Sequence, residues 1–144
     1  MIQLDDKWSV VLPSSGLDSL ILLVSQQSER LIAAYAYTIY SFDIDNGNLA
    51  WKYEAEEPIN DLHQEDNFLI VQTETGLIKL DEDGFIIWTF DLSEIILKVS
   101  LEDGFLIVED FNNRLYHLSS EKGLIVGGKI IFEPGQDERM INDC

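Results

Sequence analysis

Carboxylate pairs are the first groups in this sequence that could do chemistry. Asp81 and Asp83 stand two residues apart and could mimic the acid pair of a glycosidase. Such a pair needs one buried acid whose pKa is raised, whereas both residues precede Gly84 in a sequence typical of a water-facing turn. We therefore expect no catalytic pair here and no enzymatic activity in the chain.

Three further patterns could bind a metal or act as a nucleophile. The stretch 43–47 resembles a calcium loop, but its glycine comes one position early and no glutamate closes it, so a plain turn is the favoured interpretation. His63 and His117 each lack a His or Cys neighbour at ligand spacing. The single Cys144 lies in a polar tail without the fixed base that a catalytic thiol needs. The sequence thus predicts no catalytic residue, no metal site and no cofactor.

The elements around these residues repeat along the chain. Tyr40, Ile78 and Tyr116 are spaced by 38 residues, and Trp51 and Trp88 by 37. A unit copied at a fixed period indicates a fold that is built by stacking copies side by side.

Each copy reads as four short strands: an apolar one, a Leu-Ile-Val one, a Tyr or Leu one that ends in Asp, and one that contains Trp. This pattern predicts an all-β fold of antiparallel four-stranded blade repeats, an open or partial β-propeller, with a flattened stack like a β-sandwich as the alternative. The first strands are expected at 20–25, 59–63 and 94–100. We predict one propeller-like domain over 1–132, with repeats at about 28–64, 65–101 and 102–132, a partial unit at 1–27, and a flexible polar tail at 133–144.

The stretch 39–51 carries a resemblance to a known family. An aromatic strand runs into Asp43, a turn at Gly47 and then Trp51, which resembles pyrroloquinoline-quinone-type propeller repeats. The resemblance implies architecture over most of 28–132 but no enzyme, because the quinone dehydrogenases of that family are several times longer and draw their cofactor and calcium ligands from a complete ring. The 144 residues allow about three blades, fewer than the roughly 4 to 8 of closed propellers. We therefore expect an incomplete ring, capped at its ends or completed by a second copy.

The tryptophans mark the repeat most clearly. Trp8, Trp51 and Trp88 stand at corresponding points of successive units, and Gly127 stands where a further one would be. We expect these side chains to form the core contact between blades rather than a box for stacking a ligand.

The net charge indicates which classes of partner the chain does not bind. Its 27 acidic residues against 9 basic ones give a net charge of −18, which repels nucleic acid and anionic membranes. No apolar run approaches the roughly 20 residues of a membrane-spanning helix, and the acidic N-terminus is unlike a secretory leader. A single cysteine suits a reducing compartment. These features predict a cytoplasmic protein that binds neither nucleic acid nor membrane.

The acids gather in the connections between strands, where they serve solubility or attract a basic protein by fast, salt-sensitive association. Our hypothesis is a non-enzymatic acidic protein-binding module, an immunity-type inhibitor that neutralises a basic toxin such as a nuclease. The alternative is a structural or scaffolding repeat protein that forms a homodimer through open sheet edges. The candidate contact residues are Glu54, Glu56, Glu57, Glu65, Asp66, Asp81, Glu82, Asp83, Glu102 and Asp103.

Overall fold

The computed structural model describes residues 2–4, 8–10, 20–25, 28–130 and 139–141. Every regular element within these ranges is a β-strand. Of the predicted flexible tail at 133–144 only 139–141 are described, and Cys144 and the larger part of the predicted partial unit at 1–27 lie outside the described residues.

Three antiparallel sheets follow one another along the chain, and within each the strands pair in sequence order. The first sheet holds β3 (Leu20–Ser25), β4 (Arg30–Tyr35), β5 (Thr38–Asp43) and β6 (Leu49–Glu54). The second holds β7 (Ile59–Glu65), β8 (Phe68–Thr73), β9 (Gly76–Leu80) and β10 (Ile86–Asp91). The third holds β11 (Ile96–Glu102), β12 (Phe105–Asp110), β13 (Arg114–Ser119) and β14 (Ile125–Ile130), with β15 (Arg139–Ile141) added beside β14. A separate hairpin joins β1 (Ile2–Leu4) to β2 (Trp8–Val10).

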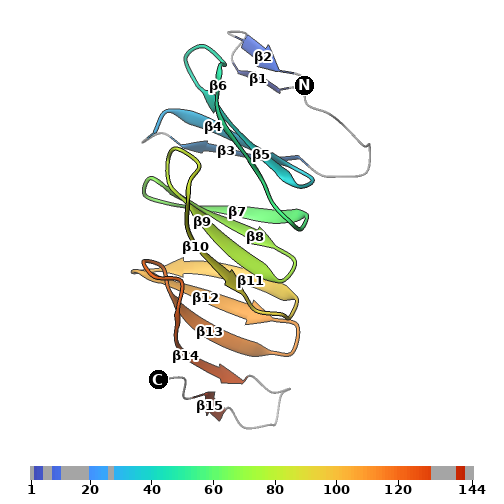
Figure 1. Ribbon diagram of the computed structural model, residues 1–144. Helices are drawn as coiled ribbons and strands as arrows, with labels where there is room; N and C mark the ends of the chain where they lie inside the picture. Colours follow the sequence, from blue (N-terminus) through green and yellow to red (C-terminus); the bar gives the residue numbers. More distant parts are fainter. Residues whose placement is uncertain (1, 5–7, 11–19, 26–27, 131–138, 142–144) are drawn as a thin grey trace.

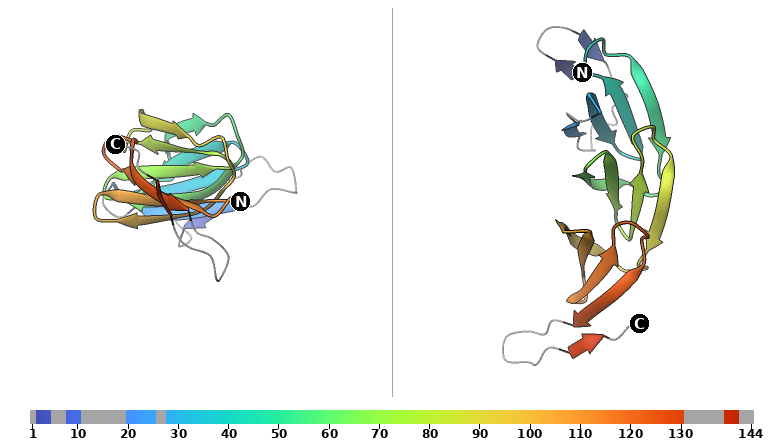
Figure 2. Two further views of the ribbon diagram at one scale, coloured as in Figure 1. Left: turned by 90° about the horizontal axis from the view of Figure 1, so that it is seen from below. Right: turned by 90° about the vertical axis from the view of Figure 1, so that its left-hand side faces the viewer.

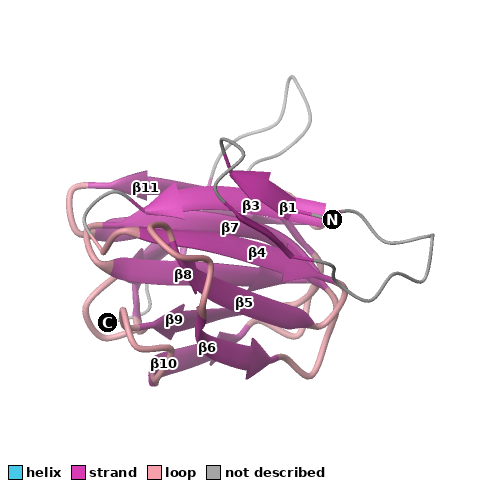
Figure 3. Cartoon of the chain, turned by 90° about the horizontal axis from the view of Figure 1, so that it is seen from above, coloured by secondary structure: helices cyan, strands magenta, loops and turns pink. Residues whose placement is uncertain are grey.

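The three sheets stack as blades in a curved, open arc (Figure 1). The first strands β3, β7 and β11 lie along the concave side, and the fourth strands β6, β10 and β14 lie along the convex side (Figure 2). Seen along the stack, each sheet overlies the next (Figure 3). The predicted all-β fold of four-stranded blades in an open propeller is therefore confirmed, and the blades do not form a flattened sandwich.

The sequence repeat and the sheets are offset. The stretch 28–64 takes the last three strands of the first blade and most of the first strand of the second. The next stretch, 65–101, is divided in the same way between the second and third blades. Each of these two sequence repeats therefore crosses a joint between blades.

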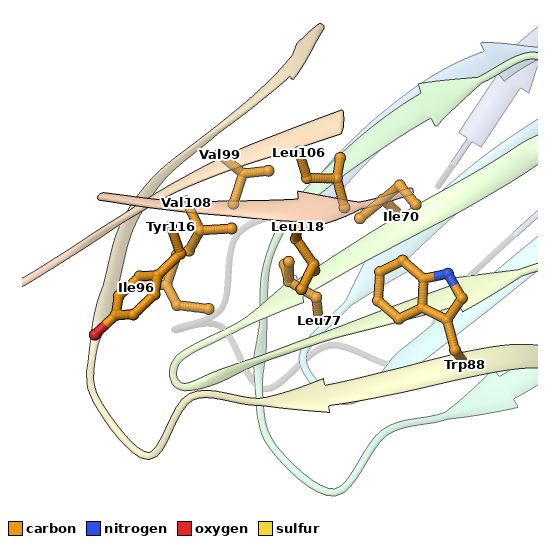
Figure 4. Close-up of a cluster of buried hydrophobic side chains, with 9 residues drawn as sticks. All are labelled: Ile70, Leu77, Trp88, Ile96, Val99, Leu106, Val108, Tyr116 and Leu118. Atoms are coloured by element: carbon orange, nitrogen blue, oxygen red, sulfur yellow. The ribbon is translucent and has the colours of Figure 1, made fainter. Parts of the chain in front are cut away.

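Hydrophobic cores lie between the blades. One cluster joins the first and second blades, and another joins the second and third, because alternate residues of a strand point to opposite faces of its sheet. In the second cluster, Ile70, Leu77 and Trp88 of the second blade face Leu106, Val108 and Leu118 of the third (Figure 4). The second blade is thus covered on both faces by its neighbours.

Candidate functional site

A tryptophan and a glycine form the joint between successive blades. The indole of Trp51 lies against Gly84 so closely that a Cβ added there would stand 2.6 Å from its Cδ2 atom. The Trp51 Nε1 donates a hydrogen bond of 2.8 Å to the carbonyl oxygen of Glu82. Trp88 repeats both contacts, lying against Gly123 and donating a bond of 2.8 Å to the carbonyl of Ser120. These two tryptophans make the blade contact that the repeat predicted, while the Trp8 side chain lies outside the described residues.

A buried lysine strengthens the second joint. Lys79 is only 5% exposed, and its Nζ donates to the Ser120 carbonyl at 2.8 Å and to Glu65 Oε1 at 3.1 Å. The Ser120 hydroxyl bonds the same Glu65 oxygen, and the ammonium lies 4.4 Å from the centre of the Phe68 ring. Glu65, one of the predicted contact residues, is therefore placed inside the joint and paired there.

The other predicted contact residues divide between the two ends of the strands. Because neighbouring strands are antiparallel, successive turns alternate between these ends. We call the ends the Asp81 face, which holds the turns 43–48, 65–67, 81–85, 102–104 and 119–123, and the Glu57 face, which holds 36–37, 55–58, 74–75, 92–95 and 111–113. Asp66, Asp81, Glu82, Asp83, Glu102 and Asp103 lie at the Asp81 face, whereas Glu54, Glu56 and Glu57 lie at the Glu57 face.

At the Asp81 face, carboxylates stabilise their own turns. The Asp81 Oδ1 atom accepts the backbone N–H groups of Asp83 at 2.9 Å and Phe85 at 3.0 Å. Asp43 accepts the N–H of Asp45 at 2.9 Å, which is the geometry of a plain turn at this stretch. These acceptors are occupied within the loop, so the geometry here serves the fold.

At the Glu57 face, two threonines hold one carboxylate. Thr73 Oγ1 donates to Glu57 Oε1 at 2.7 Å, and Thr75 Oγ1 lies 3.1 Å from both carboxylate oxygens. The bond from Thr73 is the main cause that holds the pKa of Glu57 below its ordinary value, against the opposing effect of burial. Glu57 is therefore a fixed negative charge at neutral pH.

Beside Glu57 lies an open groove of about 690 Å³ between the first and second blades. We call it the interblade groove. The end of β6 and the link to β7 form one wall, and β9 and β10 form the other. Its apolar lining residues are Tyr53, Leu77, Ile78, Ile86 and Phe90, and its acidic ones are Glu54, Glu56, Glu57 and Asp91. Burial and the nearby Glu56 raise the pKa of Tyr53, so its hydroxyl stays protonated.

Sequence reasoning missed Asp91, Thr73 and Thr75 as members of this site. A signal for Asp91 is present, since it follows Glu54 by 37 residues and ends the equivalent strand. The threonines carry no such signal, because only the fold brings them beside Glu57.

The equivalent position at the second joint is occupied by larger side chains. Tyr116 and Arg114 follow Ile78 and Gly76 by 38 residues. Tyr116 is 9% exposed and its hydroxyl donates to Asp110 Oδ2 at 3.3 Å, while burial raises its pKa. The first joint therefore has isoleucine and glycine where the second has tyrosine and arginine.

The two histidines lie on different strands, His63 on β7 and His117 on β13. His63 Nε2 is 2.9 Å from Gln72 Oε1 at the second joint, and His117 is exposed on β13.

Among the described residues, no group of three or more His, Cys, Asp or Glu side chains is placed to hold a metal ion. No helix in the described part of the chain is long and apolar enough to cross a membrane.

Comparisons with known proteins agree with this architecture. The family described as outer membrane protein assembly factor BamB matches residues 39–126. The sequence matches no curated protein.

Solved structures show the same fold at low sequence identity. BamB from Moraxella catarrhalis is 15% identical with a TM-score of 0.66, over 81% of this chain and 38% of that one. The Pan2 WD40 domain of Neurospora crassa is 14% identical with a TM-score of 0.66, over 83% of this chain and 40% of that one. The computationally designed Ika4 protein is 11% identical with a TM-score of 0.67, over 94% of this chain and 98% of that one. The chain therefore spans about two fifths of the BamB and Pan2 chains and nearly all of the designed one.

Proposed function

Since the chain belongs to the family described as outer membrane protein assembly factor BamB, we propose that it is a non-enzymatic module that binds another protein. The match over residues 39–126 is the observation that carries this proposal. An assembly factor acts on other proteins, and we transfer only that general role. The joints between blades also support this proposal. Trp51 and Trp88 hold neighbouring blades together, so the turns at the strand ends are available for contact with another protein.

We propose further that the partner is basic. The net charge of −18 supports this, because a strongly negative surface attracts a positive protein and accelerates its association. The same charge disfavours nucleic acid and anionic membranes as partners. A cytoplasmic location stays a prediction from the single cysteine.

The most specific form of the proposal is an immunity-type inhibitor that neutralises a basic toxin such as a nuclease. Its support is the charge, since nuclease domains are basic in order to hold phosphates. Adding the purified chain to a basic nuclease from the same cell tests it. The inhibitor role requires stoichiometric loss of nuclease activity, and full activity of the saturated complex contradicts it.

Self-association is the second candidate function. It is favoured by three apolar side chains on β3 at one end of the arc: Leu20, Leu22 and Val24 are 41%, 50% and 48% exposed. A second copy covering this surface would extend the stack of blades. Salt distinguishes the two functions, because screening weakens binding of a basic partner but relieves repulsion between two copies that each carry −18.

Affinity capture followed by reconstitution tests the main proposal. The tagged chain is exposed to source-cell extract at low salt, bound proteins are released by high salt, and each is purified and titrated back. Saturable binding of a purified basic protein, weakened by salt, is the expected result. Absence of saturable binding for every recovered protein refutes the proposal.

A further inference from the structure

We propose that the interblade groove is the docking site for the partner and that it takes an extended segment of protein rich in lysine or arginine. This inference rests on the proposed function and names the site and the class of ligand. It is carried by the size of the groove, the sign of its charge and the side chains that keep it open.

The groove has the size and lining of a recognition site. Its volume of about 690 Å³ lies within the roughly 300–1,000 Å³ that ligand sites occupy. Tyr53, Ile78 and Phe90 are partly buried on its walls, and Ile86 is 51% exposed. A bound segment would cover this apolar surface, which water meets in the free protein.

The charge of the lining has one sign. Four carboxylates line the groove, while its described lining contains no lysine or arginine. Glu57 is held in place by the hydroxyl groups of Thr73 and Thr75, the second of which is shared between both carboxylate oxygens. Glu54 lies 3.6 Å from Lys52, but both side chains are exposed and such a pair contributes little. A cationic segment therefore meets a net negative charge in this groove.

The shape favours an extended ligand. β6 and β10 are the last strands of their sheets, and no described strand pairs with the outer edge of either one. The groove runs beside both strands, so backbone N–H and C=O groups on their edges are available to an extended chain. Alternate side chains of such a segment would point toward the apolar walls and toward the acids.

Small side chains keep this joint open. Ile78 and Gly76 stand where the second joint has the buried ring of Tyr116 and the long side chain of Arg114. Ile78→Tyr should therefore add an aromatic ring to the wall of the groove, at the position that Tyr116 holds in the third blade.

The test uses a fluorescently labelled octapeptide in which lysine alternates with valine, titrated by anisotropy into the full chain. Ile78→Tyr fills the groove, and the pair Glu54→Gln with Glu56→Gln removes two charges from it. The pair Glu102→Gln with Asp103→Asn is the matched control, because it changes the net charge equally, from −18 to −16, at the opposite face. Circular dichroism confirms that each variant is folded.

The expected result is saturable binding of the octapeptide that falls about tenfold in Ile78→Tyr and in the groove pair, and less than twofold in the control pair. Hydrogen exchange should slow at residues 53–57 and 86–91 when the peptide binds. Equal losses in the two charge pairs would show general attraction and overturn the inference, and so would absence of saturable binding.

Titration of the purified partner with the wild type and the groove variants distinguishes failure of this inference from failure of the proposed function. Binding that the groove variants leave unchanged refutes the groove as the docking site while the module remains a protein binder. Failure to obtain any partner refutes the proposed function, even where the octapeptide binds the groove.

Discussion

Replacing Gly123 by alanine tests how the blades are joined. An added Cβ would stand 2.4 Å from Cδ2 and 2.7 Å from Cε3 of Trp88, closer than unbonded carbon atoms approach. The indole has little room to move, because Trp88 is 8% exposed and is held by its bond to Ser120. The substitution must therefore displace the ring, the turn or both.

The magnitude follows from two costs. Gly123 has a φ of +68°, and an alanine in that region costs about 1–2 kcal/mol. Forcing a methyl group into a packed contact adds about 1–3 kcal/mol. We expect Gly123→Ala to lower the free energy of unfolding by about 2–5 kcal/mol.

Gly104→Ala is the matched control. Its φ is +83°, but no heavy atom lies within 4 Å of the added Cβ, so only the backbone cost of about 1–2 kcal/mol applies. Urea unfolding followed by circular dichroism measures both variants. Equal destabilisation of the two variants would show that the close contact between Gly123 and Trp88 adds no cost of its own.

Three further predictions concern the second joint and the groove. Trp88→Phe removes the indole donor and should lower the free energy of unfolding by about 1 kcal/mol or more in denaturant titrations; an unchanged midpoint would contradict the hydrogen bond. Lys79→Met leaves the carboxylate of Glu65 without its cation and should cost about 2–3 kcal/mol, and Lys79→Met combined with Glu65→Leu should recover part of this loss; additive losses would contradict the pairing. Glu57 has a lowered pKa in the folded state, so its contribution to stability is present above its ordinary pKa of 4.5 and is lost as pH falls through the folded value. The stability difference between the wild type and Glu57→Gln should accordingly shrink on acidification from pH 7 to pH 3, and a constant difference would show that the pKa is not lowered.

The repeat made the fold predictable. Spacings of 37–38 residues between matching strands, with glycine turns and tryptophans in register, indicate a repeated unit of similar sheets. The contact of Trp51 and Trp88 with the next blade followed from the same spacing. These features are local or periodic, and both kinds can be read from the sequence without the fold.

The candidate site was less predictable, because it depends on which strand ends meet. Glu65 stands in an acidic connection, yet the fold brings it to Lys79, 14 residues along the chain, inside a joint. The groove depends on the difference in size between Ile78 and Tyr116 at equivalent positions. The sequence displays that difference but not the space that it leaves between two blades.

Calorimetric titration of the purified partner into the chain, at low and at high salt, tests whether the chain is a module that binds a basic protein. We expect saturable binding of a basic protein whose Kd rises steeply with salt, because the chain carries a net charge of −18. Binding that salt leaves unchanged would contradict a basic partner, and absence of saturable binding would contradict a protein-binding module.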